Sequence, residues 1–177
     1  VTTFLVIPIV SKMAQKFGKK ETFIVSQSIS IIGYILFWFL FIPGKPYMFL
    51  FALPFFSFGI GGLFTLMMSM TADTCDYEEL ENGLPRKEGS FGAIYWWMVK
   101  LGTALAGLLS GLIMYYVGFS ADAASQPDGA LTGLRIAYST IPIIGTLIAI
   151  YVMSDYEINE NRAKEIRTQL NERKGEM

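Results

Sequence analysis

Four long apolar segments constrain the fold of this chain more than any other feature. They cover residues 23–42, 47–72, 90–117 and 136–154, close to or above the ~20 mostly apolar residues that a helix needs to cross a bilayer. A shorter one, at 1–14, reads as part of a further membrane helix, since the chain starts at valine and we expect a longer protein. Only 16% of residues are charged, against about 25% in soluble domains. The sequence predicts an all-α membrane protein.

The basic residues predict how the segments are oriented. Successive connections alternate between several basic residues and almost none, and basic residues concentrate on the cytoplasmic side of membrane proteins. We therefore expect the acidic connection at 73–89 and the polar tail at 155–177 to face the cytoplasm, with residues 1–154 as the transmembrane bundle. In the tail, Ser154 and Glu157 have the spacing of a helix-capping box, and we expect a solvated surface helix there rather than a partner-binding one. The basic residues on the predicted cytoplasmic side are Lys12, Lys16, Lys19, Lys20, Arg86, Lys87 and five in the tail, against Lys45 and Arg135 opposite.

Composition excludes several classes of function. The chain has no histidine and one cysteine, Cys75, which excludes histidine-based triads and disulfide frameworks and argues against a zinc or other metal site. A net charge of −1 argues against a nucleic-acid partner. A membrane enzyme would need a serine–lysine pair. Ser90 and Ser110 each stand ten residues from Lys100, about 15 Å along a helix, too far for proton transfer. We therefore expect no enzyme, although a serine on another helix leaves that alternative open.

Lys100 is the one charged residue near the middle of a predicted span. It lies nine residues after Phe91, hence about 14 Å into the span, where a lysine costs roughly 2.5–3.5 kcal/mol. We interpret it as a cation that faces a watery cavity and binds a substrate oxygen or a carboxylate on another helix. The alternative is a snorkelling or structural charge. Trp96 lies one turn away on the same face and suits stacking on a sugar, whereas Tyr95 and Trp97 fit an interfacial aromatic belt equally well.

Small residues form two groups within the spans. Gly107 and Gly111 have the spacing that lets membrane helices approach closely. Gly59 and Gly62 bound a Gly-Ile-Gly-Gly run, which predicts either close packing or a flexing point. No phosphate-binding loop is indicated, because no Gly-Lys-Ser/Thr follows.

The connection at 73–89 reads, from composition alone, as an acidic solvated loop in which Cys75 is an inert thiol. Its sequence and that of the next span also carry a family pattern. The stretch ADTCDYEELENGLPRKEGSFGAIYWWMVKLG, residues 72–102, resembles the loop and following helix of the glycoside–pentoside–hexuronide:cation symporters, the melibiose-permease-like branch of the major facilitator superfamily. A second stretch, SKMAQKFGKK at 11–20, is similar to a loop motif of that superfamily, with Gln15 where an acid usually stands. The residues that carry the first match are Ala72, Asp73, Asp76, Tyr77, Arg86, Glu88, Gly89, Lys100 and Gly102.

The resemblance implies a fold and a function. The chain would be a C-terminal half fragment of a major-facilitator-type helical bundle, about 4.5 of 12 helices, running from the end of helix 8 to helix 12, and working by alternating access around a midplane site. The implied function is cation-coupled symport of a glycoside or related sugar in the bacterial inner membrane. A non-sugar solute, such as a lipid-like amphiphile, is the alternative within transport. A membrane sensor or assembly subunit is less well supported, because the tail is short.

The resemblance also implies roles for individual residues. Lys100 would lie at the sugar cavity with Trp96, and Phe64 would pack against the sugar. A cytoplasmic gate would be formed by Asp73, Asp76, Arg86 and Glu88. The coupling ion, Na⁺ or H⁺, would bind in the N-terminal half of the protein, outside these residues. The expected partners are therefore the sugar, the cation, membrane lipids and that N-terminal half, with no other cofactor.

Overall fold

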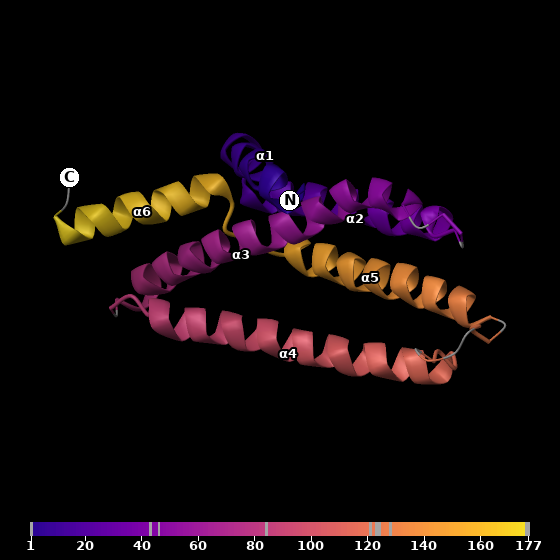
Figure 1. Ribbon diagram of the computed structural model, residues 1–177. Coiled ribbons are helices and arrows are strands. Elements are labelled where there is room, and N and C mark those ends of the chain that lie inside the picture. The colour runs from indigo at the N-terminus through magenta and orange to yellow at the C-terminus, as the bar shows by residue number, and fades with distance from the viewer. Residues whose placement is uncertain are drawn as a thin grey trace.

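The chain folds into helices joined by short connections (Figure 1). The computed structural model describes residues 2–42, 44, 45, 47–83, 85–120, 122, 125–127 and 129–175, and no strand occurs among them. Four helical segments of this described part are long and apolar enough to cross a membrane, which confirms the prediction of a helical membrane bundle. The elements are α1 (Thr2–Phe17), α2 (Lys19–Leu40), the short 3₁₀ helix η1 (Met48–Ala52), α3 (Leu53–Asn82), α4 (Glu88–Tyr116), α5 (Ala130–Ser154) and α6 (Glu160–Lys174).

Local sequence explains where α3 begins and ends. Pro54 lies in its first turn, where the missing N–H of proline costs no helical hydrogen bond. Gly83 ends it with a φ of +65°, in the left-handed region that glycine adopts without a steric penalty. The predicted span ended at residue 72, so the helix continues ten residues beyond it, through the acidic stretch. The prediction of a loop there is wrong, because Leu80 and three glutamates of this stretch, Glu78, Glu79 and Glu81, are good helix formers.

The polar tail also forms a helix, but it begins later than predicted. The N-cap of α6 is Asn159, whose side chain accepts a hydrogen bond from the backbone N–H of Arg162 at 2.9 Å. The capping box predicted at Ser154 and Glu157 is therefore wrong, since Ser154 is the last residue of α5. Ala163, Ile166 and Leu170 are buried, so α6 packs along the end of α3 (Figure 1) and is not a helix solvated on all sides.

The core lies where α1, α2, α3 and α5 meet. Its buried side chains share an apolar character and come from all four helices: Val6, Val10, Phe23, Leu66, Met70 and Met153. At one end of the bundle, Arg135 on α5 donates to the Phe41 carbonyl beyond α2 and places its guanidinium 5.7 Å from the Trp38 ring centroid. These contacts fasten α5 to α2 at that end.

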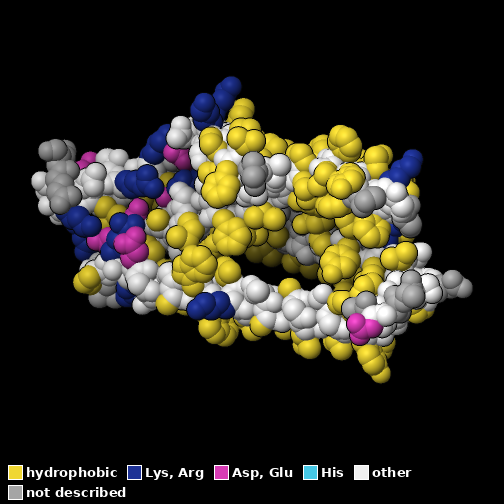
Figure 2. All heavy atoms as spheres, in the orientation of Figure 1, with side chains coloured by type: hydrophobic (Ala, Val, Ile, Leu, Met, Phe, Trp, Pro, Cys, Tyr) yellow, Lys and Arg dark blue, Asp and Glu magenta, His cyan; other side chains and the backbone are white. Residues whose placement is uncertain are grey.

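Helix α4 is set apart from the core. None of its described residues is buried, and it runs along one edge of the molecule, joined to the rest near its two ends (Figure 1). Figure 2 shows an opening between this helix and the helices above it, with charged side chains gathered at one end of the molecule. We call that end, formed by α6, the end of α3 and the starts of α2 and α4, the charged end. One long face of α4 is thus free within this chain.

Candidate functional site

Lys100 lies near the middle of α4, twelve residues after its first residue, Glu88. Its side chain is exposed, and in the described part of the chain no hydrogen bond or ion pair holds its ammonium group. Trp96, one turn earlier, is 48% exposed, and its ring is met edge-on by the Tyr95 ring at 5.4 Å between centroids. The neighbouring Trp97 is 62% exposed and projects about 100° from Trp96 around the helix. The side chains of Lys100 and Trp96 therefore lie on the same face of α4.

Phe64 lies on α3 and is 44% exposed. It bounds a hollow of about 270 Å³ whose wall also includes Gln27 of α2 and Thr146 of α5. No ring stacking, cation–π contact or hydrogen bond joins Phe64 to Lys100 or Trp96 among the residues that the structure describes. The expected sugar-site residues are thus placed on two helices, α3 and α4, without a direct contact of these kinds.

The glycines of α3 lie against serines of α2. A Cβ added at Gly59 would stand 2.6 Å from the Cβ of Ser30, and one at Gly62 would stand 2.7 Å from the Cβ of Ser26. Gln27 reinforces this contact, because its side-chain amide donates to the Gly59 carbonyl at 3.0 Å. The two helices approach as closely as small residues allow.

The glycines of α4 make no such close contact within the described part of the chain. A Cβ at Gly107 or Gly111 would meet no atom within 4 Å. The close packing expected at these two positions is therefore not made to the described residues of this chain, because this part of α4 is separated from its neighbours.

Asp73 is the centre of an ion-pair cluster at the charged end. It is 1% exposed, although the sequence suggested a solvated acidic loop. Its carboxylate pairs with Lys19 at the start of α2 and with Arg167 of α6, the latter at 2.6 Å. The burial of this carboxylate is compensated by two cations that come from two other helices.

Three of the four predicted gate residues, Asp76, Arg86 and Glu88, are joined by ion pairs next to Asp73. Arg86 contacts Asp76 at 3.3 Å and Glu88 at 3.7 Å, and Arg167 reaches Asp76 at 3.6 Å. Arg167 therefore links Asp73 and Asp76, so that one cluster contains all four. Lys87–Glu78 at 2.6 Å and Lys174–Glu79 at 2.8 Å extend it.

Lys19 and Arg167 were missed as site residues in the sequence. Lys19 belongs to the motif at 11–20, which indicated a loop typical of the superfamily. The motif did not indicate which acidic residue Lys19 would pair with. Arg167 had no local signal, because it is 94 residues from Asp73. The neighbouring Lys20 donates to the carbonyls of Ser154 at 2.7 Å and Tyr156 at 2.9 Å, which fixes the α5–α6 connection.

Tyr156 lies in that connection and helps to position it. Its hydroxyl approaches the Met70 carbonyl at 3.4 Å, and burial raises the pKa of the phenol, which stays neutral at physiological pH.

The described residues contain no group of three His, Cys, Asp or Glu side chains arranged to hold a metal ion. The arrangement suits the binding of oxygen-rich ligands by a cation and aromatic rings, together with an ionic contact between helices at one end.

Known proteins similar to this chain are named as carriers and importers. Residues 1–160 match the family described as MFS/sugar transport protein. The glucuronide carrier protein homolog of Escherichia coli is 29% identical over 94% of this chain and 36% of its own length. A putative sulfoquinovose importer of Escherichia coli is 31% identical over 96% of the chain and 35% of its own length.

A relative from a second organism has a lower identity. The isoprimeverose transporter of Lactiplantibacillus pentosus is 27% identical over 85% of the chain and 31% of its own length. The chain thus spans about a third of the length of these relatives. The matched region includes the four membrane-spanning segments. It also includes the residues of the ion-pair cluster, apart from those on α6 after residue 160. The chain is part of an integral, multi-pass membrane protein and belongs to the MFS/sugar transport family, in which the glycoside–pentoside–hexuronide:cation symporters are found.

Proposed function

We propose that the whole protein is a secondary transporter, not an enzyme, that moves a glycoside or related sugar together with a cation by alternating access. The observation that carries the proposal is Lys100, a cation near the middle of a membrane span that pairs with no carboxylate in the described chain. An ammonium group at this depth is costly unless it faces water, a ligand or an opposite charge. Sugar oxygens accept hydrogen bonds from such a group.

Trp96 and Phe64 complete the substrate-binding part of the proposal. Trp96 shares a face with Lys100 and leaves half of its surface uncovered. Phe64 supplies a second aromatic surface from α3. Aromatic rings stack on the C–H faces of sugars while the lysine binds the hydroxyls, so these three side chains suit one polar ligand with apolar faces.

The ion-pair cluster serves as the cytoplasmic gate in this proposal. Asp73, Asp76, Arg86 and Glu88 join α3 to the start of α4 at the charged end. Arg167 adds α6, and Lys19 adds α2. Ion pairs that join separate helices can exist in one state of a transporter and break in the other. We place this end in the cytoplasm of a bacterium, with the C-terminus inside and the protein in the inner membrane, because basic residues concentrate there.

The coupling ion, Na⁺ or H⁺, is assigned to the part of the protein outside this chain. The described residues offer no cluster of acidic ligands near the middle of the spans. The N-terminal half, the sugar, the cation and the surrounding lipid are therefore the partners of this segment, and no nucleic acid is involved.

Transport by the whole protein tests the proposal. The protein is reconstituted in vesicles, and uptake of labelled glucose, galactose, xylose and glucuronate glycosides is followed with an inward Na⁺ gradient, an inward H⁺ gradient or neither. We expect accumulation of at least one sugar that depends on one of the two gradients. Absence of accumulation and of sugar binding by the purified protein would overturn the proposal.

A further inference from the structure

Two adjoining hollows lie between α2, α3 and α5. The larger has a volume of about 400 Å³ and the smaller about 270 Å³. Both are bounded by Tyr34, Ile60 and Pro142, so they share a wall. Phe64 bounds the smaller one, which connects the pair to a residue that the proposed function already assigns to the substrate.

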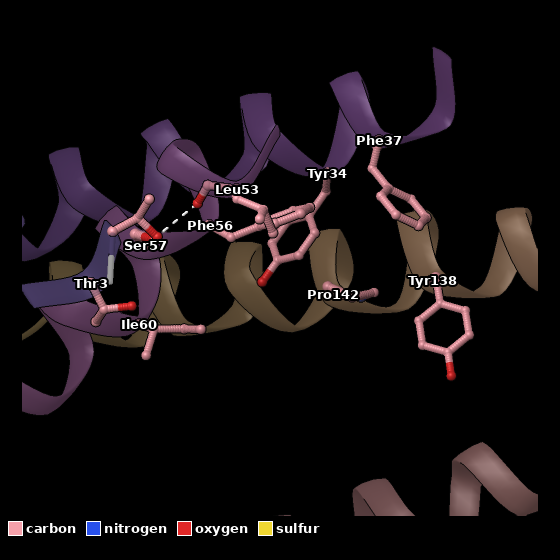
Figure 3. Close-up of a pocket in the computed structure, with 10 residues that line it drawn as sticks. Thr3, Tyr34, Phe37, Leu53, Phe56, Ser57, Ile60, Tyr138 and Pro142 are labelled. Carbon is pink, nitrogen blue, oxygen red and sulfur yellow. Dashed lines mark hydrogen bonds between the residues drawn. The ribbon is translucent and has the colours of Figure 1, made fainter. Parts of the chain in front are cut away.

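The larger hollow combines aromatic walls with a few hydroxyl groups. The Tyr34 and Phe56 rings lie 4.9 Å apart between centroids and are tilted by 40°, and Phe37 stands beside them (Figure 3). Figure 3 also shows the hydroxyls of Tyr34 and Tyr138 pointing away from the α2 ribbon. Sites for small molecules have this character, with mostly apolar walls and few polar groups that fix the orientation.

Pro142 interrupts the helical hydrogen bonding of α5 beside both hollows. Proline has no backbone N–H, so within α5 it cannot donate to the carbonyl of Tyr138 four residues earlier. The Tyr138 carbonyl therefore lacks its usual helical donor. Tyr138 itself is half exposed and lines the larger hollow.

We propose that these two hollows bind the second group of a glycoside, its aglycone, while Lys100, Trp96 and Phe64 bind the sugar ring. The inference rests on the proposed function and goes beyond it, because it assigns a second subsite to α2 and α5. The aromatic walls match a flat apolar group, and the hydroxyls match its polar edge. The protein would then prefer glycosides with a bulky aglycone over those with a small one.

Gly145 offers a direct test. It lines the smaller hollow, and an added Cβ would meet nothing within 4 Å, so the longer side chain of Gly145→Leu can begin in open space and take up volume in the hollow. The control is Thr140→Leu, which adds a similar side chain to an exposed position of the same helix outside both hollows. The probes are methyl and 4-nitrophenyl glycosides of glucose, galactose, xylose and glucuronic acid, bound to the whole purified protein.

We expect the wild type to bind a 4-nitrophenyl glycoside about tenfold more tightly than the methyl glycoside of the same sugar. Gly145→Leu should remove this difference and leave methyl glycoside binding within about twofold, and Thr140→Leu should preserve both. Equal affinities of the two glycosides for the wild type, or no effect of Gly145→Leu on their ratio, would overturn this subsite but not the proposed function. Failure of the wild type to bind any glycoside would overturn both.

A second measurement does not depend on how Gly145→Leu folds. A Tyr138→Cys variant places a thiol on the rim of the larger hollow, where the native side chain is 51% exposed. Cys75, the natural cysteine, is buried, so alkylation by a maleimide reports on position 138. We expect the 4-nitrophenyl glycoside to slow alkylation about tenfold and the methyl glycoside to leave it unchanged. Equal rates with both glycosides would contradict the subsite.

Discussion

Arg167 on α6 donates to the buried carboxylate of Asp73 on α3 at 2.6 Å, across 94 residues of sequence. Lys19 reaches the other oxygen of the same carboxylate from the start of α2. One acidic side chain therefore fastens three helices at the charged end of the bundle. This relationship explains why an acidic stretch is helical and partly buried, and it identifies the tail helix as part of the proposed gate.

Asp73→Asn should destabilise the folded protein strongly. The substitution keeps the shape of the side chain but leaves Lys19 and Arg167 without their shared anion, and the loss of hydrogen bonds to a charged group typically costs about 1.5–3 kcal/mol. Thermal unfolding in detergent measures the loss. Glu81→Gln is the control, because Glu81 is an exposed carboxylate on the same helix. Equal losses in the two variants would contradict the central position of Asp73.

Arg167→Ala should release α6 from α3 without unfolding the bundle. The Arg167 side chain is 52% exposed, and solvent screens such a pair, so we expect a loss of only about 1 kcal/mol. Cleavage by a Glu-specific protease within α6 should become several-fold faster. Lys164→Ala serves as the control, since Lys164 pairs with Glu160 of its own helix at 3.5 Å. A cleavage rate equal to that of the wild type would show that α6 is held by its apolar face alone.

Gly59→Ala should separate α2 from α3. The added Cβ would stand 2.6 Å from the Cβ of Ser30, a distance that only a backbone shift relieves, and overpacking of this kind costs about 1–3 kcal/mol. Gly107→Ala, in open space within this chain, is the matched change. Thermal stability of the whole protein should fall for Gly59→Ala. A comparable fall for Gly107→Ala would show that α4 packs through Gly107 against a helix outside this chain, and no fall at Gly59 would contradict the tight α2–α3 contact.

Trp96→Ala and Trp97→Ala should differ in sugar binding. Both tryptophans are exposed on α4. Trp96 lies about 40° from Lys100 around the helix and Trp97 about 60° to the other side, and the proposed sugar site is on the Trp96 side. Loss of a stacking ring worth ~1.4 kcal/mol reduces affinity about tenfold, and we expect this for Trp96→Ala. Trp97→Ala should bind as the wild type does. Binding to the purified whole protein is measured by calorimetry, and the reverse order of effects would place Trp97 at the substrate.

The sequence predicts the spans well because hydropathy and length depend on local composition. Its errors have a physical cause. Residues 73–82 are polar, so hydropathy places them outside the membrane, but it does not show that α3 continues into water with α6 against it. The partners of Asp73 are 54 and 94 residues away, and a single sequence contains no signal for such pairing. A tail helix was expected from the spacing of Ser154 and Glu157, yet its first residue depends on the Asn159 cap rather than on the earlier serine.

The candidate sugar site was also predictable only in part from the sequence. Lys100 and Trp96 lie four residues apart, so helical periodicity alone places them on one face. Phe64 lies on a different helix, and its neighbours Gln27 and Thr146 come from two more. That grouping depends on how α2, α3 and α5 pack, which composition and spacing do not specify.

Sugar binding by Lys100→Ala tests the account most directly. The whole protein is purified, and its affinity for the sugar that the wild type accumulates is compared with those of Lys100→Ala and Lys45→Ala, the latter an exposed lysine in a connection. Hydrogen bonds from a charged group are worth about 1.5–3 kcal/mol, so Lys100→Ala should lose roughly 10- to 100-fold in affinity. Lys45→Ala should bind as the wild type does. If Lys100→Ala instead binds with wild-type affinity, Lys100 is a structural charge and the proposed substrate site is wrong.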